Sequence, residues 1–204
     1  MIAALLAVHA MDPGYTRAML RDRGDGTVEV SIPPSPSPGQ IRTVLTRQMP
    51  VTATGRWCAG TESGSGPGWV GLVEKALAHE VAGSYPMLAR GIGGSGLRIL
   101  TGARVRLHLR LPSVAQIRAW RDQRIVMVAS THLAAPLVRT AHGPLPPHHV
   151  FAVVGADPDT GHVHLRNPWR PDDVLVIDRR TFRRGFLSLE RTRTALPERP
   201  VGSE

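Results

Sequence analysis

This chain of 204 residues contains one cysteine, Cys58, one lysine, Lys75, and few aromatic residues. One cysteine cannot form an intrachain disulfide, so a small fold held together by several disulfides is excluded. No stretch approaches the roughly 20 apolar residues of a membrane span, and the apolar start MIAALLAVHAMDP lacks the basic region of a signal peptide. Because 42% of the residues are hydrophobic and 20% charged, the composition is that of a folded protein. We expect a soluble, cytoplasmic protein that makes no membrane contact.

The net charge is +9, and nearly all the basic residues are arginines. Positive charge alone is compatible with nucleic-acid binding. The arginines are dispersed except near the C-terminus, however, and no zinc finger or aromatic ribonucleoprotein motif accompanies them. We therefore expect no nucleic-acid partner. We predict that the C-terminal arginines form the exposed side of a last helix; the alternative is that they bind an acidic substrate or partner. These arginines are Arg179, Arg180, Arg183, Arg184, Arg191 and Arg193.

The first half of the chain is predicted to be rich in helix. Residues 1–9 are apolar on every side, which is typical of a buried helix. Trp69 begins the clearest helix, 69–82, in which apolar residues repeat at i, i+3, i+4, i+7 and i+8, and Gly83 ends it. The other predicted elements of this half are a helix at 16–21, strands at 27–32 and 41–46, a helix at 84–90 and a glycine-rich connection at 91–96.

The second half is predicted to be mainly antiparallel sheet. Ser113 can cap a helix at 113–121, and the turn at 157–161 joins two strands into a hairpin. The predicted strands are 105–111, 125–129, 149–155, 162–167 and 174–177, followed by a closing helix that Asp178 can cap. These patterns predict an α+β protein with a helix-rich first lobe, 1–102, and a sheet-rich second lobe, 103–204.

The predicted hairpin brings His149 and Asn167 to the same end. If residues whose numbers sum to 318 face one another, Asn167 opposes Phe151 and shares a face with His149. A shift of one residue would place the two on opposite faces. A histidine oriented by an asparagine is what a thiol protease uses to take the proton from its cysteine. We predict that His149 and Asn167 are catalytic residues and that Trp169 packs over their contact, where its indole excludes water. The alternative for His149 is a structural histidine in a strand, and the alternative for Trp169 is a residue that only packs.

Several other histidines lie near this hairpin. They alternate on one strand or precede the hairpin, but no cysteine, aspartate or glutamate accompanies them in the spacing of metal ligands. We therefore expect them to face solvent and expect no metal site; they are His142, His148, His162 and His164.

The hairpin motifs resemble those of the calpain family of papain-like cysteine proteases. His149-Val150-Phe151 is similar to the family's His-Ala-Tyr, and Arg166-Asn167-Pro168-Trp169 to its Arg-Asn-Pro-Trp-Gly. The resemblance extends over nearly the whole chain through motifs in the family's order: Trp69, Leu72-Val73-Glu74-Lys75-Ala76, Gly83-Ser84-Tyr85, Thr101-Gly102, and the segments 122–131 and 174–186. It implies a two-lobed papain-like core and a cysteine endopeptidase that acts on protein or peptide substrates and requires no cofactor.

The resemblance also implies a cysteine that this sequence lacks. Calpains carry it in Gly-Asp-Cys-Trp at the start of a buried helix, and Met1–Leu6 is similar to the continuation of that helix. We expect the cysteine two positions before Met1, encoded upstream together with the oxyanion-hole glutamine. Cys58 precedes Trp69 in the first lobe and cannot substitute for it. The chain as given is therefore expected to be inactive. The first hypothesis is an endopeptidase that is incomplete here. The alternatives are a catalytically inactive binding or regulatory module and a fragment of a larger secreted or toxin-like protein.

Two departures from the family pattern concern the rim of the site and calcium. Arg170 replaces the glycine that follows the tryptophan in calpains. Calcium-dependent calpains carry acidic side chains between the glycine pair and the Thr-Gly motif, and residues 91–102 contain none. We therefore do not expect calcium dependence to carry over to this chain.

Overall fold

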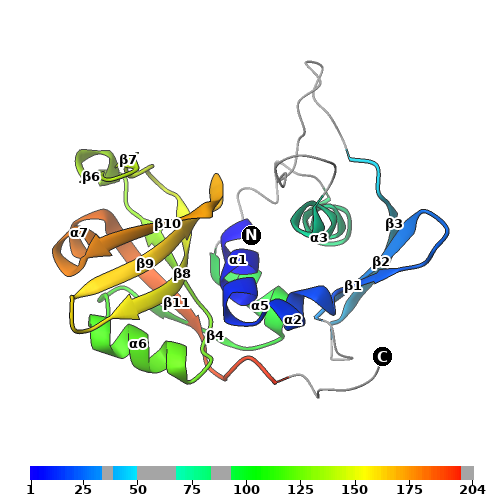
Figure 1. Ribbon diagram of the computed structural model, residues 1–204, viewed down its shortest axis with the longest axis horizontal. Coiled ribbons are helices and arrows are strands. Elements are labelled where there is room, and N and C mark those ends of the chain that lie inside the picture. The colour runs from blue at the N-terminus through cyan, green and yellow to red at the C-terminus, as the bar shows by residue number, and fades with distance from the viewer. Residues whose placement is uncertain (34–38, 50–67, 84–92, 199–204) are drawn as a thin grey trace.

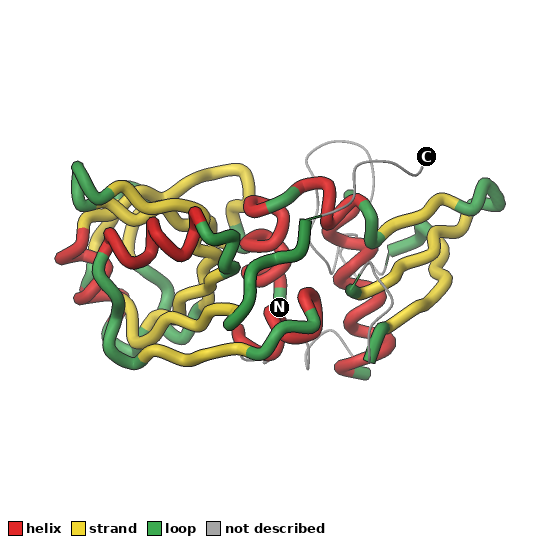
Figure 2. The backbone as a smooth tube through the Cα atoms, turned by 90° about the horizontal axis from the view of Figure 1, so that it is seen from below, coloured by secondary structure: helices red, strands yellow, loops and turns green. Residues whose placement is uncertain are grey.

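The computed structural model describes residues 1–33, 39–49, 68–83 and 93–198 of the chain. A three-stranded sheet and a six-stranded sheet lie at opposite ends of the molecule, with helices between them (Figure 1). The view from below shows the same order of strands, helices and strands along the long axis (Figure 2). Every strand pairing in the described residues is antiparallel. This part of the chain is therefore an α+β protein, as predicted.

The first half combines helices with a small sheet of order β1-β2-β3. The buried first helix, the strands at 27–32 and 41–46, and the helix that starts at Trp69 were all predicted correctly, and Gly83 takes the left-handed conformation, φ 68°, that ends this helix. The elements are α1 Ile2–Met11, α2 Pro13–Arg17, β1 Leu20–Asp22, β2 Thr27–Ile32, β3 Ile41–Thr46, α3 Trp69–Leu77 with its π-helical continuation η1 Ala78–Ala82, and α5 Gly93–Thr101.

Two predictions in this half were wrong. The second helix starts at Pro13 instead of residue 16, because the Asp12 carboxylate accepts the Tyr15 N–H at 3.0 Å and proline suits a first helical turn. The glycine-rich stretch forms the start of helix α5 because its glycines allow close packing: a Cβ on Gly96 would lie 2.9 Å from that of Ala4 in α1. The predicted helix at 84–90 and Cys58 lie outside the described residues.

The second half forms the six-stranded sheet, of order β10-β9-β8-β5-β11-β4. The predicted caps are confirmed: Ser113 Oγ accepts the Gln116 N–H at 3.1 Å, and Asp178 accepts the Thr181 N–H at 2.6 Å. The elements are β4 Val105–His108, α6 Val114–Asp122, β5 Met127–Thr131, η2 Ala135–Leu137, β6 Arg139–Thr140, β7 Gly143–Pro144, β8 Val150–Asp157, β9 His162–Asn167, β10 Arg170–Asp178, α7 Arg179–Gly185 and β11 Phe186–Thr192.

Strand β11 was not predicted, and it lies between β5 and β4 inside the sheet. The alternation of apolar and polar residues that identifies a strand is missing here, because the buried residues Ser188, Glu190 and Thr192 are polar. Helix α7 is consequently not the last element. Arg191 and Arg193 therefore do not belong to a C-terminal helix, which corrects that part of the prediction.

The six-stranded sheet has a hydrophobic cluster on each face. Val128 and Ala152 belong to the cluster that contains α1, α3 and α5. Their chain neighbours Met127 and Phe151 belong to the cluster under α6 and α7, as the alternation of a strand requires. Helix α1 contacts α3 and α5 as well as strands β5, β8 and β9, so the two ends of the molecule are joined through it.

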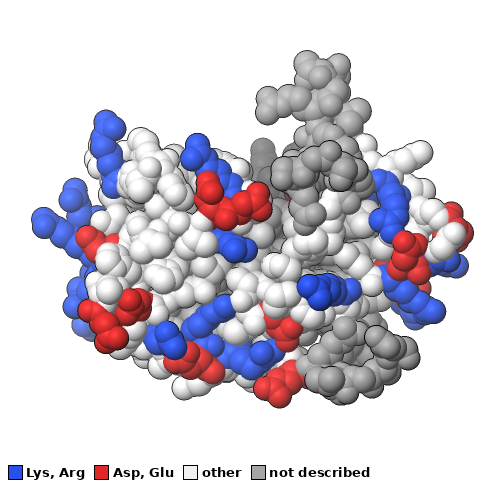
Figure 3. All heavy atoms as spheres, in the orientation of Figure 1, with Lys and Arg blue, Asp and Glu red and all other residues white. Residues whose placement is uncertain are grey.

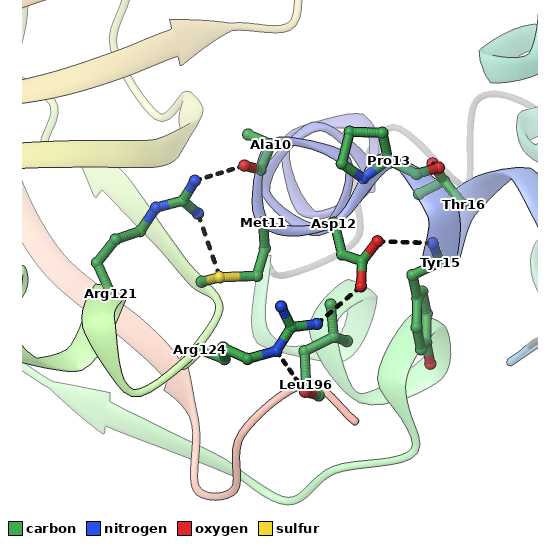
Figure 4. A network of polar contacts seen from close by, with 9 residues as sticks. All are labelled: Ala10, Met11, Asp12, Pro13, Tyr15, Thr16, Arg121, Arg124 and Leu196. Carbon is green, nitrogen blue, oxygen red and sulfur yellow. Dashed lines mark hydrogen bonds and ion pairs between the residues drawn. The ribbon is translucent and has the colours of Figure 1, made fainter. Parts of the chain in front are cut away.

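The C-terminal end of α1 is held to the second half by two arginines (Figure 4). Arg124 donates to Asp12 Oδ2 at 2.7 Å and to the Leu196 carbonyl at 3.1 Å. Arg121 donates to the Ala10 carbonyl, one of the last in α1. A helix C-terminus has unpaired carbonyls and a negative partial charge, so Arg121 satisfies one of the carbonyls and both guanidinium groups stabilise this end of α1.

A buried carboxylate joins β11 to the start of α5. Glu190 is 7% exposed, and Gly94 donates a backbone hydrogen bond to it. A Cβ on Gly93 or Gly94 would lie 2.8 Å from a Glu190 carboxylate oxygen, so a larger residue at either position would displace this side chain. Burial raises the pKa of Glu190, against the smaller effect of the Gly94 hydrogen bond.

Candidate functional site

His149 and Asn167 are in direct contact at the end of the β8–β9 hairpin. His149 Nε2 lies 2.8 Å from Asn167 Oδ1. The pairs Ala152–Arg166 and Val153–Leu165 have residue numbers that sum to 318, so the predicted register is confirmed at this end of the hairpin. A register shift between Val153 and Gly155 changes the sum to 319 toward the turn. Because the shift lies beyond the site, it does not separate the two residues.

The hydrogen bonds of Asn167 determine which nitrogen of His149 carries the proton. The backbone N–H of Trp169 donates to Asn167 Oδ1 at 3.0 Å, so this atom is the amide oxygen. An oxygen at this position can only accept from the imidazole, so Nε2 carries a hydrogen and Nδ1 keeps its lone pair. Within the described ranges, no hydrogen-bond partner occupies Nδ1. The neutral ring therefore offers a free basic nitrogen.

Aromatic rings surround the imidazole on two sides. The Trp169 ring lies over it, with 4.0 Å between the ring centroids, and Phe151 approaches it edge-on at 5.1 Å. Phe151 is fully buried, whereas Trp169 remains 70% exposed. The indole therefore covers the His149–Asn167 contact while its own outer face contacts solvent, and Arg170, also exposed, follows it at the rim.

The backbone of His149 is fixed by Thr131, which the sequence did not indicate as a site residue. Thr131 Oγ1 accepts the His149 N–H at 2.9 Å and donates to the Pro146 carbonyl at 2.6 Å. The Thr131 N–H donates to the His149 carbonyl at 2.9 Å. These bonds tie the residue before β8 to the end of β5, so the imidazole is positioned by the sheet rather than by a free loop.

The start of helix α1 lies near this imidazole. Burial lowers the pKa of His149, the Asn167 hydrogen bond opposes this effect, and the positive Met1 amino group lowers the pKa further. The pKa of the Met1 amino group is itself lowered by burial, and Glu74 of α3 opposes this change. Met1, the residue just before α1, is therefore close enough to both His149 and Glu74 to interact with their charges, and the lowered pKa favours a neutral His149 at neutral pH.

Asn167→Ala is expected to lower the pKa of His149 further, because the asparagine hydrogen bond is the contribution that raises it. The ring-proton shifts of His149 followed by NMR across a pH titration measure this change. His162→Ala, on the same strand, serves as the control and should leave the His149 titration where it was. An unchanged or raised pKa in Asn167→Ala would mean that the hydrogen bond does not form in solution.

The other histidines near the hairpin do not join this site. His148 and His142 are exposed, as expected, and His162 and His164 are partly exposed, on the face of β9 opposite the buried Val163 and Leu165. In the described part of the chain, no group of three or more His, Cys, Asp or Glu side chains is arranged to hold a metal ion. None of its helices is long and apolar enough to cross a membrane.

The sequence was compared with models of protein families and with curated proteins. No family model matches the chain, and no curated protein matches it.

Proposed function

We propose that this chain carries the histidine–asparagine half of a calpain-like cysteine endopeptidase with a papain-like core. The 2.8 Å contact between His149 Nε2 and Asn167 Oδ1 is the observation that supports it best, because it leaves Nδ1 as a free base. In a thiol protease, such a base takes the proton of the cysteine, and the thiolate then attacks the peptide carbonyl. Protein or peptide substrates follow from this reaction, and no cofactor takes part in it.

The position of α1 supports the same proposal. Met1, the residue just before α1, lies near His149, and residues Ala3–Val8 of the helix are buried. A side chain carried just ahead of such a helix would lie at the amino end, where the helix dipole lowers a thiol pKa. A cysteine two positions before Met1 fits this requirement.

A catalytically inactive binding or regulatory module is the second candidate. The observation in its favour is that the one cysteine of the given sequence, Cys58, precedes Trp69 in the first half and does not stand at the start of α1. Such a module would retain the histidine, asparagine and tryptophan for packing. The two candidates differ in whether His149 can ionise a thiol.

Extending the chain with Gly-Asp-Cys-Trp ahead of Met1 tests the proposal. Cys58→Ser in the same protein leaves the added cysteine as the one thiol. We expect that thiol to ionise well below its free pKa of about 8.5, because an imidazolium and a helix N-terminus both stabilise the thiolate. The rate of alkylation by iodoacetamide as a function of pH measures this pKa.

Two companion proteins complete the experiment. His149→Ala in the extended protein should return the thiol pKa toward the free value, whereas His148→Ala should not. An added cysteine that titrates as a free thiol whether or not His149 is present would contradict the proposal and favour the inactive module.

A further inference from the structure

One end of the molecule concentrates positive charge. All four arginines of helix α7 are exposed, whereas its Phe182 is buried. Arg139 of β6 adds a fifth at the same end, where Figure 1 places α7 beside the β6–β7 hairpin. The space-filling view shows Lys and Arg side chains gathered there (Figure 3). We call this surface the basic end; its residues are Arg139, Arg179, Arg180, Arg183 and Arg184.

The charges of the basic end are not compensated. Within residues 1–33, 39–49, 68–83 and 93–198, none of these five arginines forms an ion pair. Asp178 is next to them, but its carboxylate caps α7. Arg180 and Arg184 are spaced i,i+4, where like charges repel. Arg179 and Arg180 in the first turn oppose the helix dipole, whereas Arg183 and Arg184 in the last turn favour it. The dipole effects offset one another, and no ion pair in the described residues relieves the repulsion between the arginines.

Two exposed leucines lie beside these arginines. Leu133 is 71% exposed and Leu137 80% exposed, both on the segment that packs against the C-terminal end of α7. His132 Nε2 lies 2.6 Å from the Arg184 carbonyl, and its backbone N–H donates to the Gly185 carbonyl at 3.3 Å. The leucines are thus held next to α7 by hydrogen bonds, with their side chains directed outward.

We propose that the basic end attaches the protein to the surface of a negatively charged lipid bilayer. Arginines that lack carboxylate partners attract anionic headgroups, and neighbouring leucines can enter the boundary between headgroups and acyl chains. A rigid protein partner would need a matching hollow for each leucine, whereas a lipid surface accepts both without a fixed register. This inference revises the expectation of no membrane contact, which rested on the lack of a spanning segment and does not bear on surface attachment. It is independent of the proposed peptidase site.

Co-sedimentation of the 204-residue protein with lipid vesicles tests the proposal. We expect binding to phosphatidylcholine vesicles that contain about one third phosphatidylserine, loss of binding at high salt, and none to pure phosphatidylcholine. Arg180→Gln with Arg184→Gln should weaken binding about 25-fold, because each basic residue near such a surface contributes about fivefold. Arg17→Gln with Arg21→Gln removes the same charge from exposed positions in the first half and should have little effect.

Two further variants separate the apolar contribution from folding defects. Leu137→Ser keeps the net charge and should weaken binding several-fold, whereas Arg180→Lys with Arg184→Lys should bind nearly as well as the parent. Absence of binding to anionic vesicles, equal losses in the two glutamine pairs, or an unaffected Leu137→Ser would each overturn the proposal. Binding to polyglutamate or RNA without binding to vesicles would overturn it in favour of an acidic macromolecule.

Discussion

His149→Ala in the cysteine-extended protein is expected to lower peptidase turnover about 10,000-fold, because both the base and the counter-charge of the thiolate are lost. Asn167→Ala should cost less, since the ring stays between Trp169 and Phe151 but loses the acceptor that fixes its proton. Hydrolysis of a casein substrate by each purified variant measures both effects. The 204-residue chain itself should show no hydrolysis.

His148→Ala is the matched control for the adjacent position. His148 is exposed, and the asparagine of this site is bonded to His149 instead. The variant should keep near-parental turnover and the bell-shaped pH profile of a thiolate–imidazolium pair. Loss of activity in His148→Ala together with its retention in His149→Ala would mean that the catalytic face has been assigned one residue out of register.

Arg124→Ala is expected to lower the free energy of unfolding by about 2 kcal/mol, because a half-buried Asp12 loses its charged partner and the Leu196 carbonyl loses a donor. The backbone of Arg124 has φ 58°, which alanine adopts no more easily than arginine, so strain at this position should not change the comparison. Chemical denaturation of the parent and variant measures the difference. Arg118→Ala, which removes the exposed Asp122 pair of α6, is the control and should cost at most about 0.5 kcal/mol.

The effect of Arg124→Ala should depend on pH. Burial opposes ionisation of Asp12, but the hydrogen bonds from Arg124 and from the Tyr15 backbone outweigh it, so the pKa of Asp12 is lowered. A carboxylate with a lowered folded pKa contributes stability above its unfolded pKa and loses it as the pH falls through the folded pKa. The difference between the parent and Arg124→Ala should therefore narrow below about pH 4. A difference that grows on acidification would show that Asp12 is not the partner that matters.

The site residues could be predicted because their signal is local. His149, Asn167 and Trp169 lie within 20 residues of one another, and one turn sets their register. The burial of helix α1 could also be predicted, because a helix that is apolar on every side has to be buried. Both signals depend on residues that are close in sequence.

The parts that were missed depend on contacts between distant segments. Strand β11 carries polar residues on its buried side because Glu190 meets the start of α5, and neither segment signals the other. The glycine-rich start of α5 is helical where sequence patterns favour a loop, and there Gly94 packs against Glu190 and Gly96 against Ala4 of α1. Thr131 is as far from His149 in sequence as Asn167 is, but no single turn sets its position: it reaches the site through the pairing of β5 and β8, which are joined by the segment that contains η2, β6 and β7.

Helix α1 has a consequence for how the molecule opens. It packs on α3 and α5 and also on β5, β8 and β9, so moving the six-stranded sheet away from α3 would have to displace it. The residues in its centre, Ala4 to Val8, are buried. We therefore expect their amide hydrogens to exchange with deuterium only when the molecule unfolds globally, which would make the helix nearest to the candidate site the most slowly exchanging part of the first half.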